Sequence, residues 1–135
     1  LTVKLAEPGE SLRAGTVYLA RDGFQMGVTK DGRIRLTKES AEDGFCPSAS
    51  YLFHSVAETY GRSAIGILLT GMGRDGATGL KQLREAGGLT VAQDERSSVI
   101  FGMPGEAIRL GAAEHVLPPA QISEMVRSRV TREDR

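Results

Sequence analysis

An apolar strand, a glycine-rich turn and a helix follow one another near the middle of the chain, and this segment most limits the possible folds. Residues 64–70 are apolar almost without interruption, which is typical of a strand covered on both faces. The turn at 71–76 has the pattern G-x-G-x-x-G, and the leucines of residues 77–86 are spaced as in a helix. One acid, Asp75, lies in the turn. A carboxylate at the end of a buried strand usually orients another group or stabilises its charge. Asp75 is therefore our first candidate functional residue.

The rest of the 135 residues divides into two regions of one domain. Residues 1–38 predict strands, two of which flank the Asp-Gly pair at 31–32 and form a β-hairpin. Residues 48–131 alternate helices and strands, and the first helix has Ser48 or Ser50 as its N-cap. Such alternation gives right-handed crossovers and a parallel sheet between helix layers. The predicted fold class is therefore α/β.

Composition excludes several classes of function. Lys plus Arg and Asp plus Glu both number 17, so the chain lacks the basic excess that nucleic-acid binding needs. One cysteine, Cys46, excludes an internal disulfide and fits a reducing cytoplasm. We interpret His54 as a solvated surface residue and His115 as a structural one, and two isolated histidines make no metal site. No apolar run approaches the roughly 20 residues of a membrane span. We expect a cytoplasmic protein without metal, cofactor, nucleic acid or membrane insertion.

The glycine turn itself supports three hypotheses. It follows a strand and opens a helix, and Asp94 comes after the next strand at about the twenty residues of a dinucleotide-binding fingerprint. Against this, Asp75 would lie inside the phosphate-binding turn, where a charge pair about 4 Å apart costs roughly 1 kcal/mol in water and about 4 kcal/mol at a dielectric of 20. Asp75 could instead cap the helix that follows it. It could also be a functional acid that the N-terminus of that helix stabilises.

Several short motifs then point to one family. They are Val17–Ala20, Pro47–Ser48, Leu52–Ala57, Tyr60–Gly61, Ala64–Leu80, Ala86–Gly88, Val91–Glu95 and Phe101–Pro104. In order and spacing, over nearly the whole chain, they resemble the catalytic domain of the bacterial chemotaxis protein-glutamate methylesterases. The resemblance implies a three-layer α/β/α fold that has a mostly parallel sheet and an antiparallel β-hairpin.

The resemblance also implies a chemistry. The family hydrolyses glutamate methyl esters on chemoreceptors, and deamidates certain receptor glutamines, with a serine, histidine and aspartate triad. Asp75 matches the triad acid, and Met72 matches a methionine associated with the oxyanion hole, to which the backbone of Gly73 could add an N–H group. The implied partners are the methylated cytoplasmic region of a chemoreceptor and an upstream receiver or regulatory domain. No cofactor is implied.

The triad serine and histidine of the family lie upstream of the region that matches Leu1. We therefore expect an N-terminally truncated catalytic domain spanning 1–135 that is inactive alone. We also expect an open apolar sheet edge beside 64–70, and self-association through it. Residues around Phe24 and Cys46 depart from the family pattern. This departure keeps open a second hypothesis, a non-catalytic receptor-docking or regulatory module on the same scaffold.

Overall fold

Short strands and helices alternate through most of the molecule. The computed structural model describes residues 1–41 and 44–133. Its elements are β1 (Thr2–Leu5), β2 (Thr16–Leu19), β3 (Gln25–Val28), β4 (Ile34–Thr37), α1 (Ala49–Thr59), a 3₁₀ turn (Gly61–Ser63), β5 (Ile65–Leu68), α2 (Ala77–Glu85), β6 (Leu89–Gln93), α3 (Met103–Arg109), β7 (His115–Leu117) and α4 (Pro119–Glu133). None of the described helices is both long and apolar enough to cross a bilayer.

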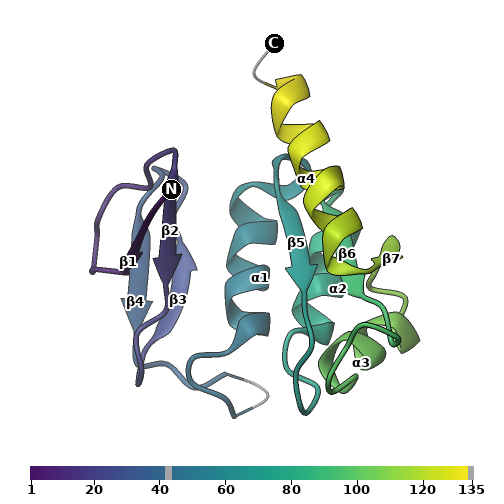
Figure 1. Cartoon of the computed structure of the whole chain (residues 1–135). Helices are drawn as coiled ribbons and strands as arrows, with labels where there is room; N and C mark the ends of the chain where they lie inside the picture. The colour runs from purple at the N-terminus through teal and green to yellow at the C-terminus, as the bar shows by residue number, and fades with distance from the viewer. Residues whose placement is uncertain (42–43, 134–135) are drawn as a thin grey trace.

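The C-terminal strands form the central layer of an α/β/α arrangement. Strands β5, β6 and β7 are parallel and hydrogen-bonded in that order. Leu68 and Leu80 belong to an apolar cluster that joins β5 to α2 and α3, whereas Val91 and Ile122 belong to a second cluster that joins β6 to α4. Figure 1 shows this sheet between α4 and α2. The predicted three layers are therefore present.

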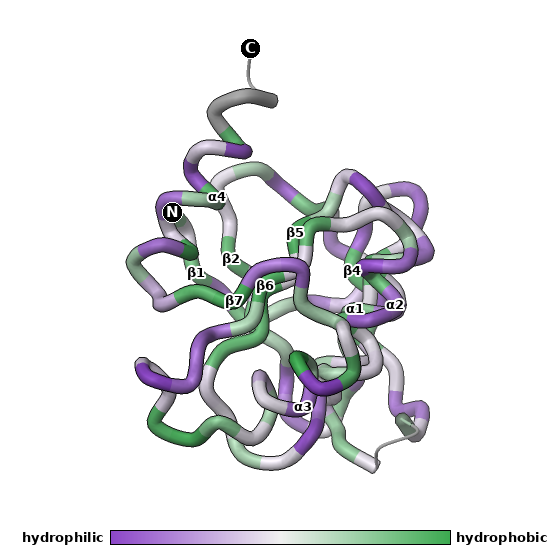
Figure 2. The backbone as a smooth tube through the Cα atoms, turned by 90° about the vertical axis from the view of Figure 1, so that its right-hand side faces the viewer, coloured by the Kyte–Doolittle hydropathy of each residue, from purple (hydrophilic) through white to green (hydrophobic). Residues whose placement is uncertain are grey.

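The strand that is buried on both faces is β6, and not the segment 64–70 as the sequence suggested. Every residue of β6 is buried, whereas β5 alternates between partly exposed isoleucines and the buried Gly66 and Leu68. The reason is position, because β6 lies between two strands and β5 pairs with one. Figure 2 shows the hydrophobic colouring concentrated on the strands in the interior.

Helix α1 lies between the two halves of the molecule and contacts both. Leu52 packs against Met26 and Ile34 of the hairpin, and Phe53 packs against the cluster that contains Leu68. The spacing of Leu52, Phe53, Val56, Ala57 and Tyr60 in the sequence predicts a single apolar stripe on this helix. Adjacent positions of a helix point in directions about 100° apart, so Leu52 and Phe53 serve two separate cores.

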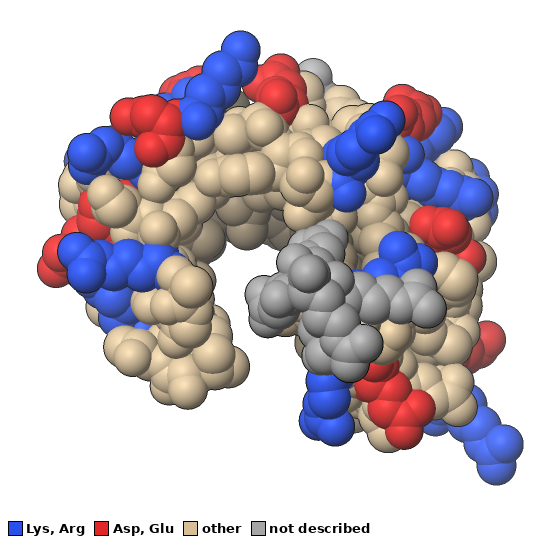
Figure 3. All heavy atoms as spheres, turned by 90° about the horizontal axis from the view of Figure 1, so that it is seen from above, with Lys and Arg blue, Asp and Glu red and all other residues tan. Residues whose placement is uncertain are grey.

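The N-terminal strands form two separate pairs. Strands β1 and β2 are parallel, and β3 and β4 form the antiparallel hairpin that the Asp-Gly pair predicts. Paired residues place Val3 beside Val17 and Leu5 beside Leu19 on one face of β1–β2, and all four are exposed. The space-filling view in Figure 3 shows a hollow between the N-terminal strands and the C-terminal half, with mostly uncharged walls.

Candidate functional site

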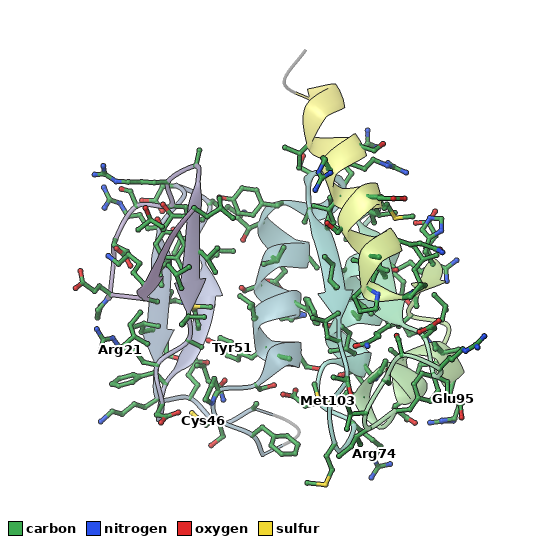
Figure 4. All side chains as sticks on the ribbon, viewed as in Figure 1. Arg21, Cys46, Tyr51, Arg74, Glu95 and Met103 are labelled. Atoms are coloured by element: carbon green, nitrogen blue, oxygen red, sulfur yellow. The ribbon has the colours of Figure 1, made fainter. Side chains whose placement is uncertain are left out.

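The glycine turn and the start of α1 meet at one end of the molecule, where β5 ends. In Figure 4 the labels of Arg74, in the turn, and Cys46, just before α1, both lie at this end. Parallel α/β sheets bind ligands in the crevice outside the carboxyl ends of their strands. Asp75 therefore lies where the topology favours a functional site.

The Asp75 carboxylate is held by the first residues of α1. Its Oδ1 accepts hydrogen bonds from the Ser48 hydroxyl at 3.0 Å and from the Ser50 N–H at 3.2 Å. Its Oδ2 accepts one from the Ala49 N–H at 2.8 Å. The N-terminus of a helix carries a partial positive charge and unpaired N–H groups, so it favours a carboxylate at this place. The acid is therefore fixed in position as well as electrostatically stabilised.

Two expectations about Asp75 need correction. The helix that follows it, α2, has Gly76 as its N-cap and no side-chain cap of its own, so Asp75 does not cap this helix. The helix whose N-terminus stabilises the carboxylate is α1, which precedes Asp75 in the sequence. The N-terminus of α2 is capped instead by Ser50, whose Oγ accepts from the N–H groups of Gly76 at 3.0 Å and Gly79 at 3.2 Å. Each helix thus caps the other.

Two glycines permit this close contact. Gly76 has a φ of 92°, a backbone conformation that residues other than glycine rarely adopt. A Cβ on Gly79 would lie 2.6 Å from both the Cα and the carbonyl oxygen of Ser50. Gly76 and Gly79 therefore serve a helix–helix contact around the acid. A dinucleotide pyrophosphate would have to displace Ser50 from the N–H groups it occupies, which argues against that hypothesis.

The first half of the turn has backbone donors without an acceptor among the described residues. The Met72 side chain is 78% exposed, and Gly73 has a φ of 90°. No hydrogen bond among the described residues uses the backbone N–H of Met72 or Gly73. The turn is supported from beneath, because the Met103 N–H donates to the Gly71 carbonyl at 2.9 Å and a Cβ on Gly102 would lie 2.9 Å from the Gly73 backbone.

A hollow of about 560 Å³ lies beside the acid. Asp75, Gly73, Arg74, Phe45 and Glu106 are among the residues that line it. The pKa of Glu106 is lowered, chiefly by its hydrogen bond from the guanidinium of Arg109 and less by the charge of Arg74. The hollow thus carries charges of both signs around an apolar floor, and it has the size of a small ligand pocket.

No hydrogen bond or ion pair joins the other polar candidates to Asp75 among the described residues. His54 is 2.7 Å from Gln82 Oε1 through Nδ1 and 3.0 Å from Glu58 Oε1 through Nε2, and His115 lies 3.9 Å from Glu114. Cys46 is exposed and forms no disulfide. The sequence missed the partner of His54 one helical turn away, but no cluster of three metal-ligating residues exists among the described residues.

The remaining acid of the dinucleotide hypothesis has a local role. Asp94 Oδ1 accepts from the N–H of Ser97 at 3.1 Å and from the hydroxyl of the same residue. Gln93, at the end of β6, accepts from the Thr70 N–H at 2.7 Å and so ties the end of β5 to its neighbour. These contacts stabilise the turn after β6, and Asp94 is committed to it.

The buried Gln25 is the residue of this region that sequence reasoning missed. It lies on β3, is 0% exposed, and accepts from the Ser48 N–H at 2.8 Å while donating to the Phe45 carbonyl at 2.7 Å. A polar residue alternating with apolar ones on a short strand gave no signal of this contact. Ser48 was expected as an N-cap, and it is one, since its Oγ accepts from the Tyr51 N–H at 3.2 Å.

Fold and site together define an α/β domain with an anchored acid at the carboxyl end of a parallel strand. Residues 1–126 match the family described as CheB methylesterase. The chain belongs to this family.

Individual relatives agree with this assignment. The chain is 52% identical over 124 residues to a protein-glutamate methylesterase/protein-glutamine glutaminase of Syntrophus aciditrophicus, a match that covers 92% of the chain and 35% of the relative. It is 54% identical over 123 residues to a protein of the same name from Geobacter metallireducens, a match that covers 90% of the chain and 35% of that relative. The crystal structure of the Thermotoga maritima CheB methylesterase catalytic domain superimposes with a TM-score of 0.84 at 35% identity, covering 90% of the chain and 66% of that domain. The chain spans about a third of the length of its curated relatives.

Proposed function

We propose that the chain supplies the acid of a carboxyl-ester hydrolase that removes methyl esters from glutamate side chains of chemoreceptors, and deamidates receptor glutamines. The observation that carries the proposal is the anchored carboxylate of Asp75 at the end of β5, in a member of this family. Relatives at 52% and 54% identity are named for both reactions. A receptor's cytoplasmic region as substrate would place the domain in the cytoplasm.

In this proposal Asp75 accepts a hydrogen bond from the Nδ1–H of a histidine. That contact holds the imidazole in the correct tautomer and stabilises the imidazolium that forms when the histidine takes the proton of a serine hydroxyl. The serine oxygen attacks the ester carbonyl, methanol leaves with the proton from the imidazolium, and water then hydrolyses the acyl-enzyme to glutamate. Asp75 itself keeps its charge throughout.

The turn beside Asp75 is the proposed oxyanion site. The backbone N–H groups of Met72 and Gly73 have no acceptor among the described residues, and a glycine turn can direct such groups toward one point. A donor of this kind contributes about 10²–10³ to kcat in other hydrolases. The exposed Met72 side chain lies where a polypeptide substrate would approach.

His54 lies beside Gln82 and Glu58, and His115 lies beside Glu114. These contacts support the proposal that the histidine of the triad, and the serine with it, come from outside this chain. We propose that they belong to a further segment of the same protein, and that an upstream receiver or regulatory domain controls the site. The 135-residue chain alone is then inactive.

An Asp75→Asn variant tests the assignment. In the full-length protein that carries these residues, we expect kcat for methanol release from a methylated receptor fragment to fall by about 10⁴, because the amide favours the wrong imidazole tautomer. The 135-residue chain by itself should release no methanol above the uncatalysed rate. Full activity in either the variant or the isolated chain would refute the proposal.

A second function is favoured by one observation, the absence of a histidine at Asp75 among the described residues. A receptor-docking or regulatory module on the same scaffold would need no such histidine. This candidate predicts that the full-length protein binds a receptor fragment with or without the Asp75→Asn substitution, and that neither form releases methanol. Comparing binding and methanol release in the same preparations separates the two functions.

The chain also carries a surface suited to self-association. One edge of β5 has no strand partner among the described residues, and the apolar face of β1–β2 is exposed. Unpaired strand edges and apolar faces tend to pair with other chains. We propose that isolated copies of this chain associate through these surfaces.

A further inference from the structure

We propose that Ser48 is a positioning residue for the reaction, and that it directs the Asp75 carboxylate so that Oδ2 is the oxygen that receives the imidazole N–H. This inference rests on the proposed role of Asp75 as the triad acid. It adds a residue from another part of the chain, and it distinguishes between the two carboxylate oxygens.

The three donors are divided unequally between these oxygens. Among the described residues, Oδ1 accepts from the Ser48 hydroxyl and the Ser50 N–H, whereas Oδ2 accepts only from the Ala49 N–H. A carboxylate oxygen has about two lone-pair sites. Oδ1 is therefore fully used, and the one site left on Oδ2 is open to a further donor.

The Ser48 hydroxyl donates to the acid and accepts from the helix that it caps. Its hydrogen is donated to Asp75 Oδ1 at 3.0 Å, and its oxygen accepts from the Tyr51 N–H at 3.2 Å. The residue is also held by its backbone, since its N–H donates to the fully buried Gln25. A buried, doubly anchored hydroxyl can fix the rotation of the carboxylate it contacts.

The residues that follow Asp75 are held by the same helix. Ser50 donates its N–H to Oδ1, and its Oγ accepts from Gly76 and Gly79 at the start of α2. The turn and the start of α1 therefore move as one unit. In the described part of the chain, Ser48 is the only residue whose side chain donates to the carboxylate. Removing its hydroxyl therefore changes the orientation of the acid with the least change to the surrounding contacts.

A serine that caps a helix could be needed for stability alone, and one substitution separates the two roles. Ser48→Gly removes the hydroxyl, but glycine is tolerated at an N-cap with a loss of helix stability far smaller than alanine causes. Ser55→Ala is the matched control. Ser55 is another buried serine of α1 whose Oγ bonds with the Val28 N–H and the Leu52 carbonyl, away from Asp75.

The test measures kcat and KM for methanol release from a methylated receptor fragment, with the full-length protein and its Ser48→Gly, Ser48→Thr, Ser55→Ala and Asp75→Asn variants. We expect Ser48→Gly to lower kcat by about 10- to 100-fold, because a small misplacement of a catalytic group has an effect of this size. KM should change by less than about twofold, since Ser48 does not touch the substrate in this proposal. Ser48→Thr, which keeps the hydroxyl, should restore most of kcat, and Ser55→Ala should lower the melting temperature without lowering kcat.

The outcomes distinguish this inference from the function on which it rests. If Asp75→Asn loses activity but Ser48→Gly behaves like Ser55→Ala, Ser48 has a structural role only and the inference is wrong while the function stands. If Asp75→Asn keeps its activity, the proposed function is wrong and the inference with it. Should Ser48→Gly fail to fold, Ser48→Asp replaces it. Aspartate caps a helix as well as serine does, but it sets a like charge against Oδ1 and should lower kcat at least as much.

Discussion

Gly79 lies at a close contact between α1 and α2, and its lack of a side chain is a condition for the whole site. A Cβ there would lie 2.6 Å from the Ser50 Cα and 2.9 Å from the Phe53 Cβ. The first of these is a backbone atom, which cannot rotate away, so the helices would have to separate. Separation would lengthen the bonds from Ser50 to Gly76 and Asp75.

We therefore predict that Gly79→Ala destabilises the chain. Alanine is favoured over glycine in a helix by about 1 kcal/mol, but forcing a methyl group into a packed contact costs about 1–3 kcal/mol. The free energy of unfolding, measured with urea, should fall. Gly105→Ala is the control, because the nearest atoms to its Cβ belong to the Phe101 ring, which can move. Equal or greater stability in the Gly79→Ala protein would contradict the close packing of these helices.

The residues of the site differ in how far the sequence could reveal them. Asp75 was accessible because strand, glycine turn and acid are consecutive, so a local pattern contains the whole feature. The donors to Asp75 lie 25 to 27 residues earlier in the chain, and Gln25 is 23 residues from the serine it holds. No periodicity connects such distant positions. The sequence therefore predicted an acid and a cap, and only the fold brings the two together.

At the scale of elements, a local pair ties β1 to the loop that follows it. Lys4 Nζ is 2.5 Å from Glu10 Oε2, and the Glu10 carbonyl accepts from the Ile34 N–H of β4. The hydrogen bond from Lys4 is the main cause that lowers the pKa of Glu10, and the same bond raises the pKa of Lys4. The pair therefore links β1, through the loop, to the hairpin.

We predict that Glu10→Gln lowers stability in a pH-dependent way. The pKa of Glu10 is lower in the folded chain than its ordinary value of 4.5, so its contribution is complete above that value and is lost as the pH falls through the lowered pKa. In urea unfolding the variant should be less stable than the native chain at pH 7, and the difference should vanish on acidification. Glu7→Gln is the control, since Glu7 lies 3.8 Å from Lys4. If the difference in the free energy of unfolding between the Glu10→Gln variant and the native chain stays constant down to about pH 2, this role of Glu10 is contradicted.

The elements themselves were largely predictable, with errors where tertiary position decides. Alternating strands and helices and the hairpin follow from local spacing, and the structure confirms them. The double burial expected for 64–70 belongs to β6, because only the order of strands in the sheet determines which strand is central. The single stripe expected on α1 failed for a related reason, since a helix between two cores needs two apolar sides.

At the scale of the whole molecule, α1 separates two groups of strands that share no hydrogen-bonded sheet among the described residues. One group has an exposed apolar face, formed by Val3, Leu5, Val17 and Leu19. The other group ends in an edge of β5 that has no strand partner in the described part of the chain. Figure 3 shows the hollow that lies between the two groups. Burying apolar surface yields roughly 25 cal/mol per Å², so covering such surfaces with another polypeptide is favourable.

We predict that the isolated chain self-associates and that a single charge on the apolar face weakens this association. Val3 is 62% exposed on β1, where lysine would place a solvated charge against any partner, as natural edge strands do to prevent pairing. The weight-average sedimentation coefficient of the native chain should rise with concentration, and that of Val3→Lys should rise less. Val99→Lys is the control, because Val99 is 89% exposed and belongs to neither group of strands, so its variant should behave as the native chain does. A native chain that sediments as a monomer at every concentration would exclude association through these surfaces. If Val3→Lys and Val99→Lys weaken the association equally, the cause is the change in net charge and not the position of the lysine.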